Sequence, residues 1–177
     1  MHILALSGSL RAASSNSTLI RALPALAPDG VTVAIYDGLA QLPPFNPDLD
    51  IDNVATAVAD FRSQLRAADA VVICSPEYAH GVPGVLKNAL DWIVSSGEFM
   101  HKPVGLINAS PASQFAQAQL TETLTVMMAN VLADASPTVA VQGRRLDEAG
   151  IVADAELAAT IRSALRALKR AVDDRDR

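Results

Sequence analysis

The sequence predicts a three-layer α/β fold, with a doubly wound parallel sheet between two layers of helices. Five short apolar runs alternate with five longer stretches in which apolar side chains recur every three or four residues. Continuous apolar strands joined by helices are typical of a parallel sheet that is buried on both faces. No internal repeat or low-complexity linker interrupts this alternation, so we expect residues 1–177 to form a single domain.

Each predicted strand is a mostly apolar run between polar turns. We expect the strands at residues 3–6, 31–36, 70–74, 104–108 and 138–141. Residues 37–52 form a polar, proline-rich connection after the second strand, and connections of this length are often functional. Residues 143–150 are expected to form a second polar loop.

The predicted helices each carry one apolar stripe. The side chains expected to face inward are, helix by helix, Leu19, Ile20, Leu23 and Leu26; Val54, Val58, Phe61 and Leu65; Leu86, Leu90 and Ile93; Leu120, Leu124, Met127 and Val131; and Leu157, Ile161, Leu165, Leu168 and Val172. The third helix is expected at about residues 84–95. Met127 and Met128 would lie on adjacent faces of the fourth helix, which suggests a contact between subunits.

Composition excludes several classes of function. The net charge of −5 argues against a nucleic-acid partner. No apolar run approaches the length of about 20 residues that a membrane span needs, and residues 3–6 suit a strand better than a signal peptide. The single cysteine, Cys74, cannot form an internal disulfide and is compatible with the cytoplasm, where we expect the protein. No Cys/His cluster has metal-ligand spacing, so we expect no metal.

The turn after the first strand has the composition of a phosphate site. It supplies neutral donors and one guanidinium, from Ser9, Arg11, Ser14, Ser15, Asn16 and Ser17. In a parallel sheet this turn lies at the carboxyl edge, where the N-terminus of the next helix attracts anions. The dinucleotide fingerprint and the ATP-binding glycine loop are both absent. A simple polar turn with a serine or asparagine cap is the alternative interpretation.

A second candidate loop follows the apolar run 70–74. Pro76 and Pro83 stiffen this loop, and Gly81 and Gly84 give it conformational freedom, before a helical pattern begins. A strand, a rigid turn and a helix start, in that order, form the usual ligand edge of an open α/β sheet.

Taken together, the two loops resemble the NADPH-dependent FMN reductase family, a flavodoxin-like group that includes quinone and chromate reductases. The first matching motif is Gly8-Ser9-Leu10-Arg11-x-x-Ser14-x-Asn16-x-x-Leu19. The second is Pro76-Glu77-Tyr78-x-x-Gly81-x-Pro83-Gly84-x-Leu86-Lys87-Asn88-Ala89-Leu90-Asp91-Trp92. The resemblance implies a five-stranded sheet in the order 2-1-3-4-5, with FMN bound noncovalently.

The resemblance also implies which residues bind FMN. Its phosphate would be held by Ser9, Arg11, Ser14 and Asn16, with Ser15 and Ser17 as further donors. Its ring would be lined by Pro76, Glu77, Tyr78 and Gly81 and bordered by Ser110. Many relatives carry a Gly-Gly turn near Ser110 and an asparagine after the tyrosine, whereas this chain has residues 109–113 without glycine and Ala79 before His80. Tyr78, His80 and Phe45 would shape the outer substrate site.

The implied function is an NAD(P)H oxidoreductase. Hydride from NADPH or NADH would pass through FMN to a quinone, a flavin or a similar small acceptor in a ping-pong cycle. The flavin would perform the chemistry, so no side chain is expected to be catalytic. A flavin-binding electron carrier or redox sensor is the alternative, and a domain that has lost FMN is a third. The family implies a homodimer or homotetramer.

Several motif residues also have ordinary structural explanations. Lys87 and Asp91 are four residues apart on a helix and suit a surface ion pair. Trp92 suits the core or a subunit contact, and Cys74 suits a buried small hydrophobe. Arg144 and Arg145 could meet the 2′-phosphate of NADPH, although a solvated pair is the simpler interpretation.

Overall fold

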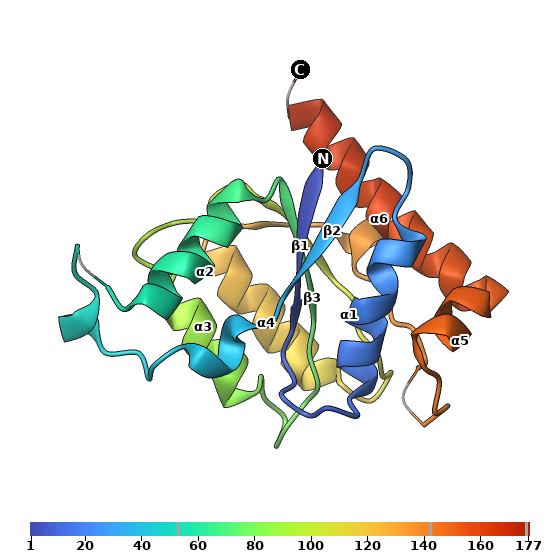
Figure 1. The fold of residues 1–177 in the computed structure, drawn as a ribbon, viewed down its shortest axis with the longest axis horizontal. Coiled ribbons are helices and arrows are strands. Elements are labelled where there is room, and N and C mark those ends of the chain that lie inside the picture. Colours follow the sequence, from blue (N-terminus) through green and yellow to red (C-terminus); the bar gives the residue numbers. More distant parts are fainter. Residues whose placement is uncertain (53, 142, 176) are drawn as a thin grey trace.

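The computed structural model of the chain describes residues 1–52, 54–141, 143–175 and 177. Within these residues, five strands form one all-parallel sheet in the order β2-β1-β3-β4-β5. The strands are β1 (His2–Ser7), β2 (Thr32–Tyr36), β3 (Ala70–Cys74), β4 (Pro103–Leu106) and β5 (Asn130–Val131) (Figure 1). The predicted flavodoxin-like strand order is confirmed.

Helices cover both faces of the sheet (Figure 1). They are α1 (Ser15–Leu26), α2 (Thr56–Ala67), α3 (Gly84–Asp91), α4 (Gln114–Val126), α5 (Glu148–Ala153) and α6 (Ala155–Arg175). Alternate residues of β1 point to opposite faces, as strand geometry requires. Ile3 and Ala5 join one buried cluster with α1, α5 and α6, whereas Leu4 and Leu6 join a second cluster with α2, α3 and α4.

The fifth strand begins earlier than the sequence predicts. Its two residues pair with Pro103 and Val104, and a 3₁₀ turn at Ala133–Ala135 then interrupts the sheet edge. A Cβ atom on Gly105 would lie 2.6 Å from the carbonyl oxygen of Ala135, so this glycine allows the turn to pack against β4. The predicted strand at 138–141 is therefore only a continuation of the edge, with an isolated bridge between Asn108 and Thr138.

Helix α4 ends before the last residues of its predicted stripe. Met128 takes a left-handed conformation (φ 60°), and the N–H of Ala129 bonds to the carbonyl of Leu124 at 2.9 Å. These are the features of a Schellman C-cap, here without glycine. Val131 lies in β5 instead, so its assignment to the helix was wrong, and Met127 and Met128 lie just past the helix end.

The region predicted as a polar loop at 143–150 contains the start of α5. The side chain of Asp147 caps this helix by accepting from Gly150 N at 2.8 Å. Arg144 is paired, because its Nη2 donates to Asp154 Oδ2 at 2.6 Å. Helix α3 is also shorter than predicted, ending at Asp91.

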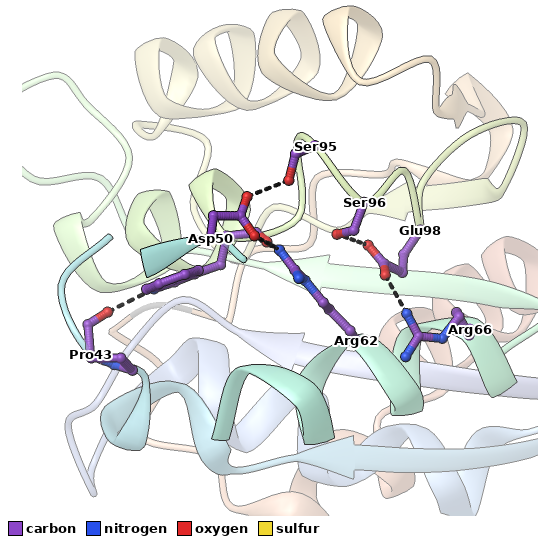
Figure 2. Close-up of polar contacts among 8 residues, drawn as sticks. Pro43, Asp50, Arg62, Arg66, Ser95, Ser96 and Glu98 are labelled. Atoms are coloured by element: carbon purple, nitrogen blue, oxygen red, sulfur yellow. Dashed lines mark hydrogen bonds and ion pairs between the residues drawn. The ribbon is translucent and has the colours of Figure 1, made fainter. Parts of the chain in front are cut away.

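The connection between β2 and α2 is fastened to α3 and to the segment that follows it. The indole Nε1 of Trp92 donates to the carbonyl of Pro43 at 2.8 Å, and Asn88 Nδ2 donates to the same oxygen at 2.9 Å. Figure 2 shows the carboxylate of Asp50 between the hydroxyl of Ser95 and the guanidinium of Arg62. The long connection, which contains the short 3₁₀ helices Gly38–Gln41 and Pro47–Leu49, is thereby held in one place by side-chain contacts.

Three motif residues take the structural roles predicted for them. Lys87 Nζ donates to Asp91 Oδ1 at 2.6 Å, four residues along the helix. Trp92 is buried in the core, with 1% of its surface exposed. These contacts fix α3 and therefore the loop that immediately precedes it.

Candidate functional site

Three loops meet at the carboxyl edge of the sheet and enclose a polar cavity. They follow β1, β3 and β4, and this edge lies at the bottom of Figure 1. The cavity has a volume of about 260 Å³. Its lining residues are Ser9, Arg11, Ala13, Ser14, Ser15, Asn16, Pro76, Glu77, Tyr78, Ala109, Ser110 and Ser113.

The loop after β1 ends in the N-terminus of α1, which forms one side of the cavity. Ser14 caps the helix by accepting from Ser17 N at 3.4 Å, and Ser15 and Asn16 form its first turn. Backbone N–H groups in a first turn lack intrahelical acceptors, and the helix dipole is positive there. Arg11 lies on the same side, exposed, with its backbone N–H bonded to Ser9 Oγ at 3.3 Å. These donors and this cation suit a phosphate monoester.

The loop after β3 contains a tight two-residue turn. Tyr78 and Gly81 exchange backbone hydrogen bonds of 3.1 and 3.0 Å, and Ala79 and His80 lie between them with φ of 50° and 59°. Positive φ at both central residues defines a type I′ turn, which normally uses asparagine or glycine. The turn leaves Tyr78 51% exposed beside the cavity.

Helix α4 holds this loop in place through three contacts. The backbone N–H of Ala116 donates to Glu77 Oε2 at 2.9 Å, and Gln119 Oε1 accepts from Val82 N at 2.8 Å. The ring of His80 stacks on Phe115, with 4.1 Å between centroids. Sequence reasoning missed all three residues of α4, because nothing local in the sequence pairs positions that lie this far apart.

The loop after β4 forms without glycine. Asn108 Oδ1 accepts from Ser110 N at 3.0 Å, and the backbone of Ser113 bonds back to Ser110 at 3.1 Å. Positive φ occurs nowhere in residues 109–113, so the backbone of this loop does not require glycine. Ala109, Ser110 and Ser113 line the cavity, and of these only Ser110 was a predicted contact.

Some predicted residues lie outside the lining set. Ser17 Oγ is bonded to Ser7 Oγ at 2.8 Å, Gly81 closes the turn, and His80 stacks on Phe115. Phe45 packs edge-on against Trp92, with 5.1 Å between ring centroids. The remaining predicted contact residues, Ser9, Arg11, Ser14, Ser15, Asn16, Pro76, Glu77, Tyr78 and Ser110, lie together around one cavity.

The cavity fits FMN because its hydrogen-bond donors suit the phosphate and because the loops after β1 and β3 lie close together. Its N-terminal helix turn and Arg11 match a phosphate. The loop after β4 presents small side chains to a flat ring, and the loop after β3 presents the rings of Pro76 and Tyr78. A Cβ atom on Gly8 would lie 2.5 Å from Ser75 Oγ, so glycine is what allows the first two loops to approach. Over the described part of the chain, no group of three His, Cys, Asp or Glu could hold a metal ion.

Of the helices that the structure describes, none is both long enough and apolar enough to cross a lipid bilayer.

Comparison with known proteins identifies the family. Residues 1–143 match the family described as NADPH-dependent FMN reductase. The chain is 35% identical over 159 residues to an NAD(P)H-dependent FMN reductase of Pseudomonas aeruginosa, covering 82% of this chain and 85% of that protein. It is 38% identical over 94 residues to a quinone reductase of Escherichia coli, which is 52% of this chain and 50% of the relative.

A solved structure shares the whole fold. The flavoenzyme NAD(P)H:(acceptor) oxidoreductase FerB of Paracoccus denitrificans superposes with a TM-score of 0.83 at 26% identity, covering 98% of this chain and 97% of the other. The matched family profile spans both loops that line the cavity after β1 and β3. The chain therefore belongs to the NADPH-dependent FMN reductase family, an oxidoreductase family that uses FMN with NAD(P)H.

Proposed function

We propose that this protein moves reducing equivalents from NAD(P)H to a quinone, a flavin or a similar small acceptor, with FMN held in the three-loop cavity. The observation that carries the proposal is the convergence of predicted FMN contacts from all three loops on one cavity. When bound, FMN supplies the hydride acceptance and the electron delivery. The protein's own task is to bind FMN, to orient its ring and to shield it from water.

The first loop is proposed to hold the phosphate. Ser9, Ser14 and Asn16, with the N–H groups at the start of α1, offer hydrogen bonds without a net charge. Arg11 adds the cation and can bind two phosphate oxygens at once. Ser15 also lines this end, whereas Ser17 supports it from behind through Ser7.

The second and third loops are proposed to orient the ring. Pro76, Glu77 and Ser110 line the cavity, and the α4 contact through Glu77 limits the freedom of the loop. Gly81 contributes by closing the turn that carries Tyr78. A rigid wall of this kind keeps the reacting face in one position, which is the main protein contribution in cofactor enzymes.

Both substrates are proposed to use the same open side of the cavity in turn. The exposed ring of Tyr78 and the stacked ring of His80 border that side. A single shared face requires NAD(P)⁺ to leave before the acceptor enters, which is a ping-pong scheme. The relatives named as FMN reductase and quinone reductase support this class of acceptor.

Initial-rate kinetics test the proposal. Varying NADPH at several fixed concentrations of 1,4-benzoquinone should give parallel double-reciprocal lines, and FMN should be needed for activity. An electron carrier or sensor would instead bind FMN without turnover, and intersecting lines would contradict the shared face.

The proposal includes a homodimer or homotetramer in the cytoplasm, where the thiol of Cys74 would stay reduced. Val94, Met100 and Met128 are 56%, 54% and 51% exposed, and His101 N donates to Met128 O at 2.8 Å. This bond brings the segments after α3 and α4 side by side, so their apolar side chains offer a subunit contact. Sedimentation of the Met128→Glu variant should show dissociation relative to the natural protein.

A further inference from the structure

Cys74 links two of the three loops that form the cavity. It is the last residue of β3 and has 0% of its surface exposed. Its Sγ donates to Asn16 Oδ1 at 3.1 Å, and Asn16 lies in the first turn of α1. Ala109, in the loop after β4, lies close enough to the sulfur for its backbone N–H to favour the thiolate slightly. Asn16 and Ala109 both line the cavity, whereas Cys74 lies behind them.

The backbone of Cys74 is held as firmly as its side chain. Its carbonyl accepts from Gly8 N at 2.9 Å, and in the sheet it is paired with Ser7 of β1. The sulfur therefore has a set position relative to the start of α1. Because Cys74 leads into the loop after β3 and is bonded to Gly8 and Asn16, in the loop after β1 and the first turn of α1, it fixes these two walls of the cavity relative to each other.

The thiol is a donor at physiological pH. Burial raises the pKa of Cys74 to about 12, against a smaller opposing effect from the Ala109 N–H, so the sulfur keeps its proton. An asparagine side chain has one acceptor oxygen and two N–H donors on opposite branches. Because Cys74 donates, the oxygen of Asn16 faces the sulfur and the amide nitrogen is the branch left for other partners.

This orientation matters for an anion. A phosphate accepts hydrogen bonds and would be repelled by an amide oxygen. We propose that Cys74 is a positioning residue that sets the amide of Asn16 so that its N–H₂ group, and not its oxygen, serves the FMN phosphate. The inference rests on the proposed function, because it takes the phosphate of FMN as the ligand of Asn16.

The test compares FMN with riboflavin, which lacks the phosphate. Cys74→Ala removes the donor, and we expect FMN affinity, measured by fluorescence quenching with the apoprotein, to fall about 2- to 10-fold. Riboflavin affinity should stay unchanged. Cys74→Ser keeps a hydroxyl donor and should restore most of the FMN affinity. Val72→Ala, two residues earlier in the same buried cluster, is the control for general loosening of the core and should leave the FMN-to-riboflavin ratio unchanged.

A second measurement needs no flavin. The S–H stretching band of Cys74, the sole thiol in the sequence, should shift to higher frequency in Asn16→Ala, because the acceptor is lost. Equal weakening of FMN and riboflavin by Cys74→Ala, or an unshifted S–H band in Asn16→Ala, would overturn the inference. Failure of the natural protein to bind FMN at all would instead overturn the proposed function, whatever the S–H band shows.

Discussion

Arg62 on α2 donates from Nη2 to Asp50 Oδ1 at 2.7 Å (Figure 2), while its Nε donates to the carbonyl of Trp92 at 3.1 Å. The two charged side chains are only 11% and 12% exposed. One guanidinium thereby ties the long connection after β2 to the end of α3. Since α3 starts directly after the loop that carries Tyr78, this cluster supports the site from outside it.

Asp50→Ala should lower the free energy of unfolding by about 3 kcal/mol, because it leaves the buried guanidinium of Arg62 without its carboxylate partner, with only the carbonyl of Trp92 as an acceptor. Chemical denaturation measures this change. Asp48→Ala, in the same connection but exposed, is the matched control and should change stability by less than about 0.5 kcal/mol. Equal effects of the two substitutions would show that the Asp50–Arg62 pair contributes nothing.

The same carboxylate makes stability depend on pH. Hydrogen bonds from Ser95 and then Arg62 lower the pKa of Asp50 in the folded protein. Its stabilising contribution is therefore complete above the unfolded pKa of about 3.9 and is lost as the pH falls through the lower, folded value. The stability difference between the natural protein and Asp50→Asn should shrink below about pH 4. Denaturation curves at pH 7, 5, 4 and 3 measure it, and a difference that grows on acidification would contradict the assignment.

Gly8→Ala should destabilise the protein by about 1–3 kcal/mol and weaken FMN binding, because the added methyl meets Ser75 across the two loops. Thermal unfolding and FMN titration would both report this. Gly84→Ala is the control, since a Cβ atom there has no neighbour within 4 Å and the residue begins a helix. That variant should be as stable as the natural protein or slightly more so.

Glu77→Ala should weaken FMN binding about tenfold, because the loop loses its charged contact with the backbone of Ala116. Glu77→Gln keeps a carbonyl oxygen as acceptor and should lose much less. Fluorescence titration with FMN distinguishes the two. If glutamine were as harmful as alanine, the charge itself, and not the contact with α4, would be what the site needs.

The sequence alone predicts the layers and the phosphate loop, because both depend on local patterns. Apolar runs mark the strands wherever the sheet is buried on both faces, and the donors around Asn16 are neighbours in the chain. The sequence does not predict where α4 ends, because Met128 takes the left-handed conformation that glycine usually occupies after a helix. The position of β5 could not be predicted from the sequence either, since it depends on the packing of Ala135 against Gly105.

The hydrogen bonds that hold the loops of the site could not be predicted from the sequence for a different reason. The bonds from Ala116 to Glu77 and from Gln119 to Val82 join a loop to a helix 39 and 37 residues away. Cys74 has the burial expected of a small hydrophobe, but its hydrogen bond to Asn16 depends on the pairing of β1 with β3. Such contacts follow from the assembled fold and not from any one segment.

The most direct test of the proposed activity is an anaerobic titration of the FMN-loaded protein with NADPH, followed by visible absorbance. We expect the oxidised flavin bands to bleach and then to return when 1,4-benzoquinone is added. Bands that persist with both NADPH and NADH would contradict the oxidoreductase assignment, and a protein that retains no FMN would contradict the cavity assignment itself.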